Sequence, residues 1–293
     1  MPSEIRCLAR IMRAVSIAVI ALVSTLLPTS ASGASGTFSG VERWERAVRS
    51  NRAADLQELY STDPPARYVG RNKEPQDISE EFDFWERLRA AGLPGLEIQQ
   101  RGGADQQGLH FVSLTVSFKM QTPAGPRTRY VLEDQAWQQQ GDTWRIVIVK
   151  HSGIVKMPQP SKLDPSLYPP HVDAKKEIAL ALARAGREHK RVILVFGANW
   201  CYDCHVLDFA LHQPDIAAIA NPNFVVVHVD IGEGKLNNDV AQQYKTPLDH
   251  GVPVLAVLDS SGNVLYSQQH GEFESARSMD PDDLVTFLNR WKP

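Results

Sequence analysis

The amino-acid sequence predicts two domains of different class, an α+β domain with helices on a curved antiparallel sheet and then an α/β domain. The length of 293 residues is comfortable for two domains of about 100–150 residues each. A proline-rich stretch over residues 156–172 predicts an extended linker, because proline fixes φ and lacks a backbone N–H. Helices precede strands over residues 38–155, whereas helices and strands alternate over residues 173–293.

The first domain is expected to begin with helices and to end with strands. Apolar residues at helical spacing predict three helices: Val41, Trp44 and Val48; Leu56, Leu59 and Tyr60; and Phe82, Trp85 and Leu88. Strict alternation from Val112 to Met120 then predicts a half-buried antiparallel strand. Further strands are expected over residues 129–138 and 144–151, joined by a tight turn.

The second domain is expected to begin with a helix capped by Asp173. Continuous apolar runs over residues 192–196 and 224–229 predict buried central strands. Residues 254–266 carry a hairpin signal. Asp280 caps the last helix, whose apolar side chains form one stripe.

Residues 1–34 have the pattern of a secretory signal peptide. Arginines come first, residues 14–27 are apolar and uncharged, and small residues follow, so cleavage is expected after Ala31 or Ala34. The apolar run is short for a membrane span, which needs about 20 residues, although an uncleaved anchor is the alternative. We therefore expect a bacterial protein in the periplasm or secreted, without a stable membrane span after cleavage.

Charge and cysteine content exclude other classes. The chain has 34 acidic and 31 basic residues, whereas a nucleic-acid-binding protein is expected to have a strong basic excess. Three cysteines are too few for a small fold held together by disulfides. Export would remove Cys7 and leave only Cys201 and Cys204.

Cys201 and Cys204 form a C-x-x-C motif directly after an apolar strand and at the start of a helix. At a helix N-terminus, unpaired N–H groups and the helix dipole stabilise a thiolate on the first cysteine. The second cysteine lies one turn along, close enough to attack a mixed disulfide and release the partner. Pro253 precedes a later strand and is expected to be cis, which would bring the Val252 backbone next to the sulfurs.

The sequence Trp200-Cys-Tyr-Asp-Cys204 after an apolar strand, with Gly251-Val-Pro253 downstream, resembles the thioredoxin-like superfamily. The resemblance covers about residues 173–293. It implies that Cys201 is the nucleophile, Cys204 the resolving thiol and Trp200 a lid over the site. It also implies that Val252 and Pro253 bind an extended client peptide.

Two departures from the thioredoxin pattern concern the proton of the resolving thiol. A buried aspartate and a lysine on the next strand are replaced here by Val195 and Val226. Within the motif, Asp203 is expected to disfavour a thiolate on Cys201, or else only to complement the helix dipole. His205 would act in the opposite direction when it is protonated.

The first domain resembles the SnoaL-like branch of the nuclear transport factor 2-like fold. Residues 47–60 and the closing strand over residues 144–151 carry the resemblance. It implies a cone with a pocket, which Tyr130, Asp134 and His151 are expected to face. Some such domains are enzymes and many only bind or dimerise, so a non-catalytic role, including a homodimer through this domain, is expected.

Other sites would use the same motif. Cys201, Cys204 and His205 fit the C-x-x-C-H pattern of c-type haem attachment, although neither the preceding apolar strand nor Trp200 is required there. Structural zinc would need His205 and His212 as further ligands. A purely structural disulfide would close a short loop and gain little chain entropy.

Together these patterns predict an exported thiol–disulfide oxidoreductase that works without a cofactor, in the reducing or isomerising direction. Its clients would be protein thiols and disulfides, and the cycle requires an external redox partner that the sequence does not name. The alternative is a redox-inert binding module that uses the pocket of the first domain.

Overall fold

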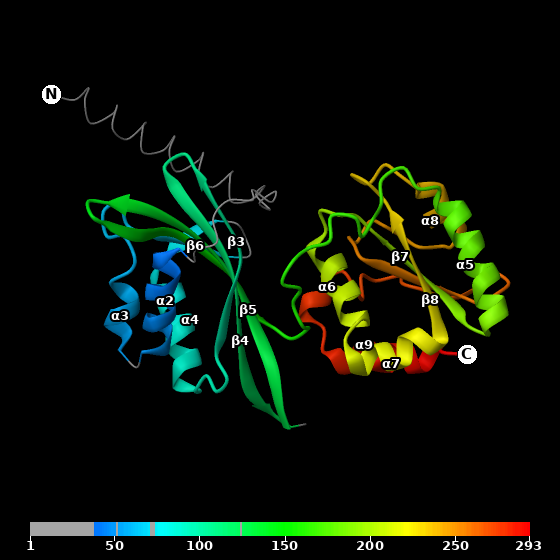
Figure 1. The fold of residues 1–293 in the computed structure, drawn as a ribbon, viewed down its shortest axis with the longest axis horizontal. Coiled ribbons are helices and arrows are strands. Elements are labelled where there is room, and N and C mark those ends of the chain that lie inside the picture. Colours follow the sequence, from blue (N-terminus) through cyan, green and yellow to red (C-terminus); the bar gives the residue numbers. More distant parts are fainter. Residues whose placement is uncertain (1–37, 51, 71–73, 124) are drawn as a thin grey trace. The chain divides into compact units, whose positions relative to one another are not determined.

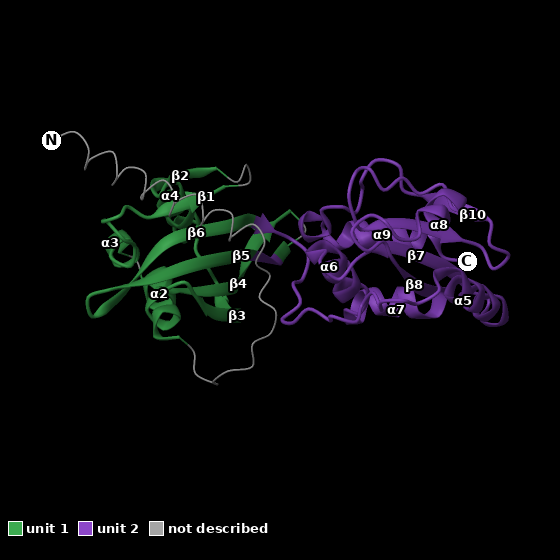
Figure 2. Cartoon of the chain, turned by 90° about the horizontal axis from the view of Figure 1, so that it is seen from above, with its two compact units in different colours: residues 1–126, 131–153 green, residues 127–130, 154–293 purple. Residues whose placement is uncertain are grey.

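The computed structural model describes residues 38–50, 52–70, 74–123 and 125–293. The expected signal peptide lies outside these residues. No helix within the described ranges has the length and apolarity needed to cross a bilayer. The chain divides into two compact units, coloured separately in Figure 2, and the second unit contains all residues from Ile154 onward.

Three helices open the first unit, as the sequence predicts (Figure 1). They are α2 (Ser39–Arg49), α3 (Ala53–Gln57) and α4 (Ser79–Ala90). Each of the longer helices places apolar side chains in the core that it shares with the sheet, and Trp44 of α2 and Trp85 of α4 are fully buried there. The second helix is shorter than expected, because the chain leaves it before Tyr60, which bridges to Ile146 instead.

The sheet of the first unit has six strands in the order β2-β1-β6-β5-β4-β3. Their bounds are β1 Arg67–Val69, β2 Pro75–Asp77, β3 Glu97–Gln106, β4 Leu109–Thr122, β5 Gly125–Gln140 and β6 Thr143–Val155. The sequence predicts β4, β5 and β6 but not the first three strands, which are short or rich in polar residues and glycine. The prediction of a wholly antiparallel sheet is wrong at one position, because β1, which lies between β2 and β6, pairs parallel to β6.

The second unit is an α/β domain, as expected. Its sheet order is β10-β9-β7-β8, with β7 (Arg191–Gly197) parallel to β8 (Phe224–Asp230). Strand β9 (Val254–Leu258) is antiparallel to β7, and β10 (Val264–Ser267) closes the edge. The central strands β7 and β9 are almost wholly apolar because helices cover both of their faces. Strand β8, whose apolar run predicts a central strand, lies at the sheet edge instead.

Alternate side chains of β7 point to different helices. One face packs against α5 (Ala174–Glu188) and α8 (Asn238–Gln243). The opposite face packs against α6 (Tyr202–Leu211), α7 (Pro214–Asn223) and α9 (Pro281–Trp291). A short 3₁₀ helix, η1 (Ala276–Ser278), precedes α9. Asp173 and Asp280 cap their helices as predicted.

The proline-rich residues 156–172 contain no helix or strand, as expected, but they do more than join the two domains. They pack on the second unit. The backbone N–H groups of Lys156 and Met157 donate to the carbonyl oxygen of Arg277, and Met157 is fully buried. Tyr168 of the same stretch is also fully buried. This segment is therefore part of the second unit's packing.

A pair of buried carboxylates lies in the first unit. Glu81 on α4 and Glu133 on β5 have no exposed surface. Tyr60 Oη and Trp85 Nε1 donate to Glu81 Oε1 over 3.0 and 2.8 Å, and Gln135 Nε2 donates to Glu133 Oε1. The second oxygen of each carboxylate has no hydrogen-bond partner among the described residues. Burying two such groups favours their protonated forms.

The residues expected to face a pocket separate in the structure. His151 is buried, with its Nε2 atom 3.6 Å from Glu81 Oε2 and its ring stacked on Phe84. Asp134 instead points to the opposite face of β5, where it accepts a hydrogen bond from Ser113. Tyr130 is half-buried and lies on β5, four residues before Asp134. The burial of Glu133, the residue directly before Asp134, was not predicted from the sequence.

The stability of the first unit is predicted to fall as pH rises from about 4.5 to 7. Desolvation raises the pKa of Glu81 from 4.5 to about 7, and burial together with the charge of Glu81 raises the pKa of Glu133. The folded state then binds more protons than the unfolded state in this window, and Glu81 alone accounts for roughly 3 kcal/mol. Urea unfolding of the full chain followed by tryptophan fluorescence measures this slope.

The control is Glu81→Gln, which keeps an acceptor for Tyr60 and Trp85 but cannot ionise. We expect its pH slope between 4.5 and 7 to be flatter than that of the parent. Equal slopes in the two proteins would mean that Glu81 does not hold a proton in the folded state.

Candidate functional site

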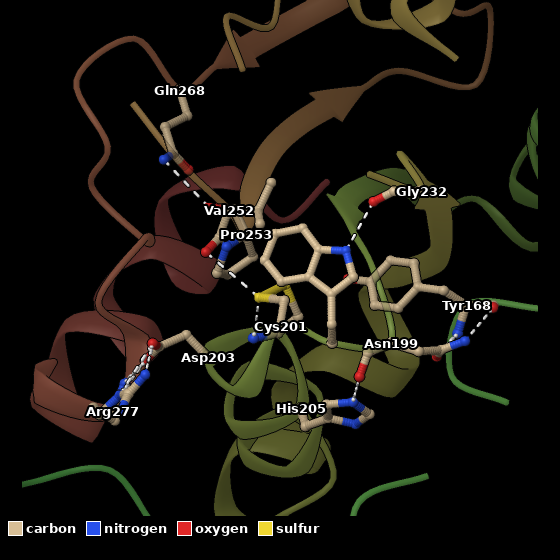
Figure 3. Close-up of a disulfide and its surroundings, with 12 residues drawn as sticks. Tyr168, Asn199, Cys201, Asp203, His205, Gly232, Val252, Pro253, Gln268 and Arg277 are labelled. Atoms are coloured by element: carbon tan, nitrogen blue, oxygen red, sulfur yellow. Dashed lines mark hydrogen bonds and ion pairs between the residues drawn. A yellow bond between two sulfur atoms is a disulfide. The ribbon is translucent and has the colours of Figure 1, made fainter. Parts of the chain in front are cut away.

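The C-x-x-C motif lies where the buried strand β7 ends and α6 begins. Cys201 is the N-cap of α6, and its Sγ atom accepts a hydrogen bond from the backbone N–H of Cys204 over 3.1 Å. The two cysteines form a disulfide (Figure 3). The capping interaction means that the helix already presents an N–H to the sulfur that would become a thiolate on reduction.

The two sulfurs differ in environment. Cys204 has no exposed surface, whereas Cys201 retains 5%. An incoming thiolate or disulfide therefore meets Cys201 first, and Cys204 can react only with a bond already made to Cys201. This asymmetry agrees with the roles of nucleophile and resolving thiol that the resemblance implies.

The loop before β9 lies against Cys201. The Val252–Pro253 peptide is cis, as predicted, and the Val252 carbonyl oxygen is 3.5 Å from Cys201 Sγ. Gln268, which is 1% exposed, holds this loop: its side-chain oxygen accepts from the Leu255 N–H over 3.1 Å and its amide group donates to the Pro253 carbonyl. The sequence gives no sign of this role, because Gln268 lies in a polar stretch after β10.

Trp200 directly precedes Cys201 in the chain and has 48% of its surface exposed. Its Nε1 atom donates to the carbonyl oxygen of Gly232 over 2.8 Å, which fixes the indole plane. Leu236 packs next to Gly232 and is 49% exposed. Two exposed apolar side chains, Trp200 and Leu236, therefore lie next to Gly232.

His205 is turned inward, away from the sulfurs' exposed side. Its Nε2 atom donates to the carbonyl oxygen of Asn199 over 2.9 Å, and only 4% of the residue is exposed. In both the haem and the zinc alternatives, this imidazole would have to project from the motif and ligate the metal ion. The described part of the chain also has no group of three or more histidine, cysteine or carboxylate side chains arranged to hold a metal ion.

Asp203 has a partner that the sequence did not reveal. Arg277 of η1 binds it through Nε, over 3.0 Å to each carboxylate oxygen, through a further guanidinium nitrogen, and through the backbone N–H over 2.8 Å (Figure 3). The guanidinium carbon also lies 5.0 Å from the centre of the Tyr202 ring. The expected effect of Asp203 on Cys201 is therefore offset by a positive charge, because the pair is neutral as a whole.

Tyr168 and Asn199 join the proline-rich segment to the motif. The Tyr168 N–H donates to Asn199 Oδ1 over 2.9 Å, and Asn199 Nδ2 donates to the Tyr168 carbonyl over 2.7 Å. The Tyr168 ring is buried with Cys201 and Cys204 in one cluster. The sequence did not predict a role for either residue. Tyr168 lies in a proline-rich stretch that was interpreted as a linker, and the hydrogen bonds of Asn199 are made with that stretch.

Comparison with protein families matches residues 173–260 to a model described as thioredoxin-like. The comparison with curated proteins gave no match. Among solved structures, a disulphide isomerase from Xylella fastidiosa Temecula1 is 37% identical, with a TM-score of 0.40; the match covers 42% of this chain and 94% of that one.

Two solved structures similar to the first unit have lower identity. A nuclear transport factor 2-like protein of unknown function in nutrient uptake, from Rhodospirillum rubrum, is 18% identical, with a TM-score of 0.30 and coverage of 40% of this chain and 97% of that one. A nuclear transport factor 2-like superfamily protein from Salmonella enterica serovar Typhimurium is 14% identical, with a TM-score of 0.32 and coverage of 39% and 86%.

The family match contains both cysteines, the strand that precedes them and the cis-proline. It agrees with the sheet order and with helices on both faces of the central strands. The carboxyl-terminal unit of this chain is a thioredoxin-like domain, and the first unit that precedes it has the α+β architecture of helices on a six-stranded sheet.

Proposed function

We propose that this protein is an exported thiol–disulfide oxidoreductase that reduces or isomerises disulfides in protein clients. The observation that carries the proposal is the Cys201–Cys204 disulfide at the N-terminus of α6, with the more accessible sulfur 3.5 Å from the Val252 carbonyl oxygen. A thiolate formed on Cys201 gains the helix N-terminus, and a client backbone can pair beside it.

The reaction follows from the two environments. The Cys201 thiolate attacks a client disulfide, a mixed disulfide forms and one client sulfur leaves as a thiolate. Cys204 then loses its proton and attacks Cys201 Sγ, which releases the second client thiolate. The protein is left in the disulfide state, so an external dithiol must return two electrons before the next cycle. The redox partner stays a prediction, as does the homodimer.

The proposed direction rests on the charges around Cys201. Arg277 and Asp203 neutralise each other, so the Cys201 thiolate is stabilised by the helix N-terminus without a net positive charge from this pair. A strongly oxidising disulfide requires exceptional stabilisation of the thiolate. The arrangement therefore favours a reductase or an isomerase over a dedicated oxidant.

Replacing Cys201 with alanine is expected to reduce the catalysed reduction of insulin by dithiothreitol to the uncatalysed rate. The reason is that Cys204 has no exposed surface and cannot replace the nucleophile. Turbidity from the released insulin chains measures the rate, and Tyr244→Phe, a change in a buried tyrosine of the same domain, serves as the control. Equal rates for the parent and Cys201→Ala would favour the redox-inert binding module.

The charge pair beside the motif predicts opposite shifts for its two members. Arg277→Gln leaves the Asp203 carboxylate unpaired and should raise the pKa of Cys201, whereas Asp203→Asn leaves the guanidinium unpaired and should lower it. Each shift is expected to be roughly half a unit to one unit at low salt. The rate of Cys201 alkylation against pH, in a Cys204→Ser background, measures the pKa. A double variant should return near the parent value; shifts of the same sign would contradict this account.

Cys204→Ser is expected to accumulate mixed disulfides between Cys201 and its clients, because the resolving sulfur is absent. The trapped species should be recovered from the periplasmic fraction of the host if residues 1–34 direct export. Non-reducing electrophoresis followed by mass spectrometry identifies the clients. Recovery of the trapped species from the cytoplasm alone would contradict the proposed compartment.

A further inference from the structure

Tyr168 places a hydroxyl group beside the buried sulfur of the motif. The residue has no exposed surface, and its Oη atom has no hydrogen-bond partner within the described parts of the chain. A Cβ atom built on Gly197 would lie 2.6 Å from Cys204 Sγ and closer still to Tyr168 Oη. Both atoms therefore occupy the space that a side chain at Gly197 would need, at the end of β7.

The position of Tyr168 is fixed by its main chain. Its N–H and carbonyl groups are both bound by the Asn199 side chain, over 2.9 and 2.7 Å. Asn199 stands two residues before Cys201 in the loop that carries the motif. The phenol is thus attached to the same loop as the sulfurs, and its orientation does not depend on a contact of its own hydroxyl.

The surroundings keep the phenol protonated. Burial raises the pKa of Tyr168 above its ordinary value, and the charges of Asp208 on α6 and Asp230 on β8 raise it further. The His228 ring meets the Tyr168 ring edge-on at 5.2 Å, and its Nε2 atom lies 3.3 Å from Asp208 Oδ1. The hydroxyl can therefore donate a hydrogen bond but is a poor site for a negative charge.

The remaining titratable groups of the motif helix are already engaged. Asp203 is bound by Arg277 and His205 by the Asn199 carbonyl. Where thioredoxin-like proteins can carry a buried aspartate, Val195 is buried on β7, opposite His228 in the sheet register. Of the described residues that form the hydrophobic cluster around Cys204, Tyr168 is the one that carries a hydroxyl group.

A buried hydroxyl without a partner is destabilising, so its presence indicates an acceptor in another state of the protein. Reduction supplies one, because a thiolate is a far stronger acceptor than a disulfide sulfur. We propose that Tyr168 is a positioning residue for the resolving thiol, donating a hydrogen bond from Oη to Cys204 Sγ in the reduced and mixed-disulfide states.

The proposal rests on the proposed function and adds one interaction to its second step. Cys204 loses its proton to solvent, and the hydrogen bond from Tyr168 favours the resulting thiolate. The electron pair on Cys204 Sγ then forms the bond to Cys201 Sγ, and the client sulfur leaves with the electrons of the broken bond. Tyr168 keeps its proton throughout. Once the disulfide forms, the hydroxyl loses its acceptor, which favours the dithiol form.

The test is Tyr168→Phe, which removes only the oxygen. In a Cys201→Ser background, the ultraviolet absorbance of the thiolate, followed against pH, reports the pKa of Cys204 without any reagent reaching the buried sulfur, and we expect that pKa to rise by about one unit without the hydrogen bond. With Cys201 present, resolution of a mixed disulfide with glutathione should be about tenfold slower at pH 7, and the equilibrium should shift toward the protein disulfide. Tyr244→Phe is the matched control and should change none of these values.

A Cys204 pKa and a resolution rate equal to those of the parent would overturn the proposal. Asn199→Ala offers a second route, because it releases the main chain of Tyr168 and should raise the Cys204 pKa while leaving the phenol intact; no change there would count equally against it. The absorbance titration needs no client. A parent protein that fails to exchange with glutathione therefore contradicts the proposed function, and an unchanged Cys204 pKa contradicts only the role of Tyr168.

Discussion

The disulfide at the start of α6 depends on the close approach of three groups at the end of β7. Gly197 ends the strand, and the sulfur of Cys204 and the hydroxyl of Tyr168 occupy the space that a Cβ at this position would need, so no side chain fits there. The strand can bring the motif to this point because it is buried on both faces and held between β8 and β9. The helix that begins at Tyr202 then presents an N–H group to Cys201. The packing at the end of β7 and the position of the two sulfurs therefore depend on the same contacts.

The motif is also held from the far end of the chain. Arg277 binds the Asp203 carboxylate and lies over the Tyr202 ring, so both residues between the cysteines contact one side chain. The carbonyl oxygen of Arg277 in turn accepts two N–H groups at the start of the proline-rich segment. A partly buried ion pair that is broken on one side leaves a charge without its partner, which is more costly than never having the pair. The segment, the 3₁₀ helix and the motif helix therefore constrain one another.

Features with a local signal could be predicted from the sequence. The central strands, the capped helices, the C-x-x-C pair and the cis-proline each have a signature within a few residues. Arg277, Gln268 and Tyr168 have none, because each acts through a contact with residues distant in the sequence. The prediction for the inward-facing side of β5 was wrong by one residue: Asp134 was expected to face the interior of the domain, but Glu133 is the buried residue. Since side chains alternate along a strand, a shift of one residue reverses the face.

The proline-rich segment has a consequence for how this domain can be cut and transplanted. The thioredoxin-like family match covers residues 173–260, which include both cysteines but neither Tyr168 nor Arg277. A fragment trimmed to that region would retain the reactive pair and lose the groups that flank it on both sides. The smallest piece that carries the complete environment of the sulfurs starts at Lys156 and continues past η1. In this chain the proline-rich segment supplies contacts to the reactive site of the domain that follows it, and so is part of that domain.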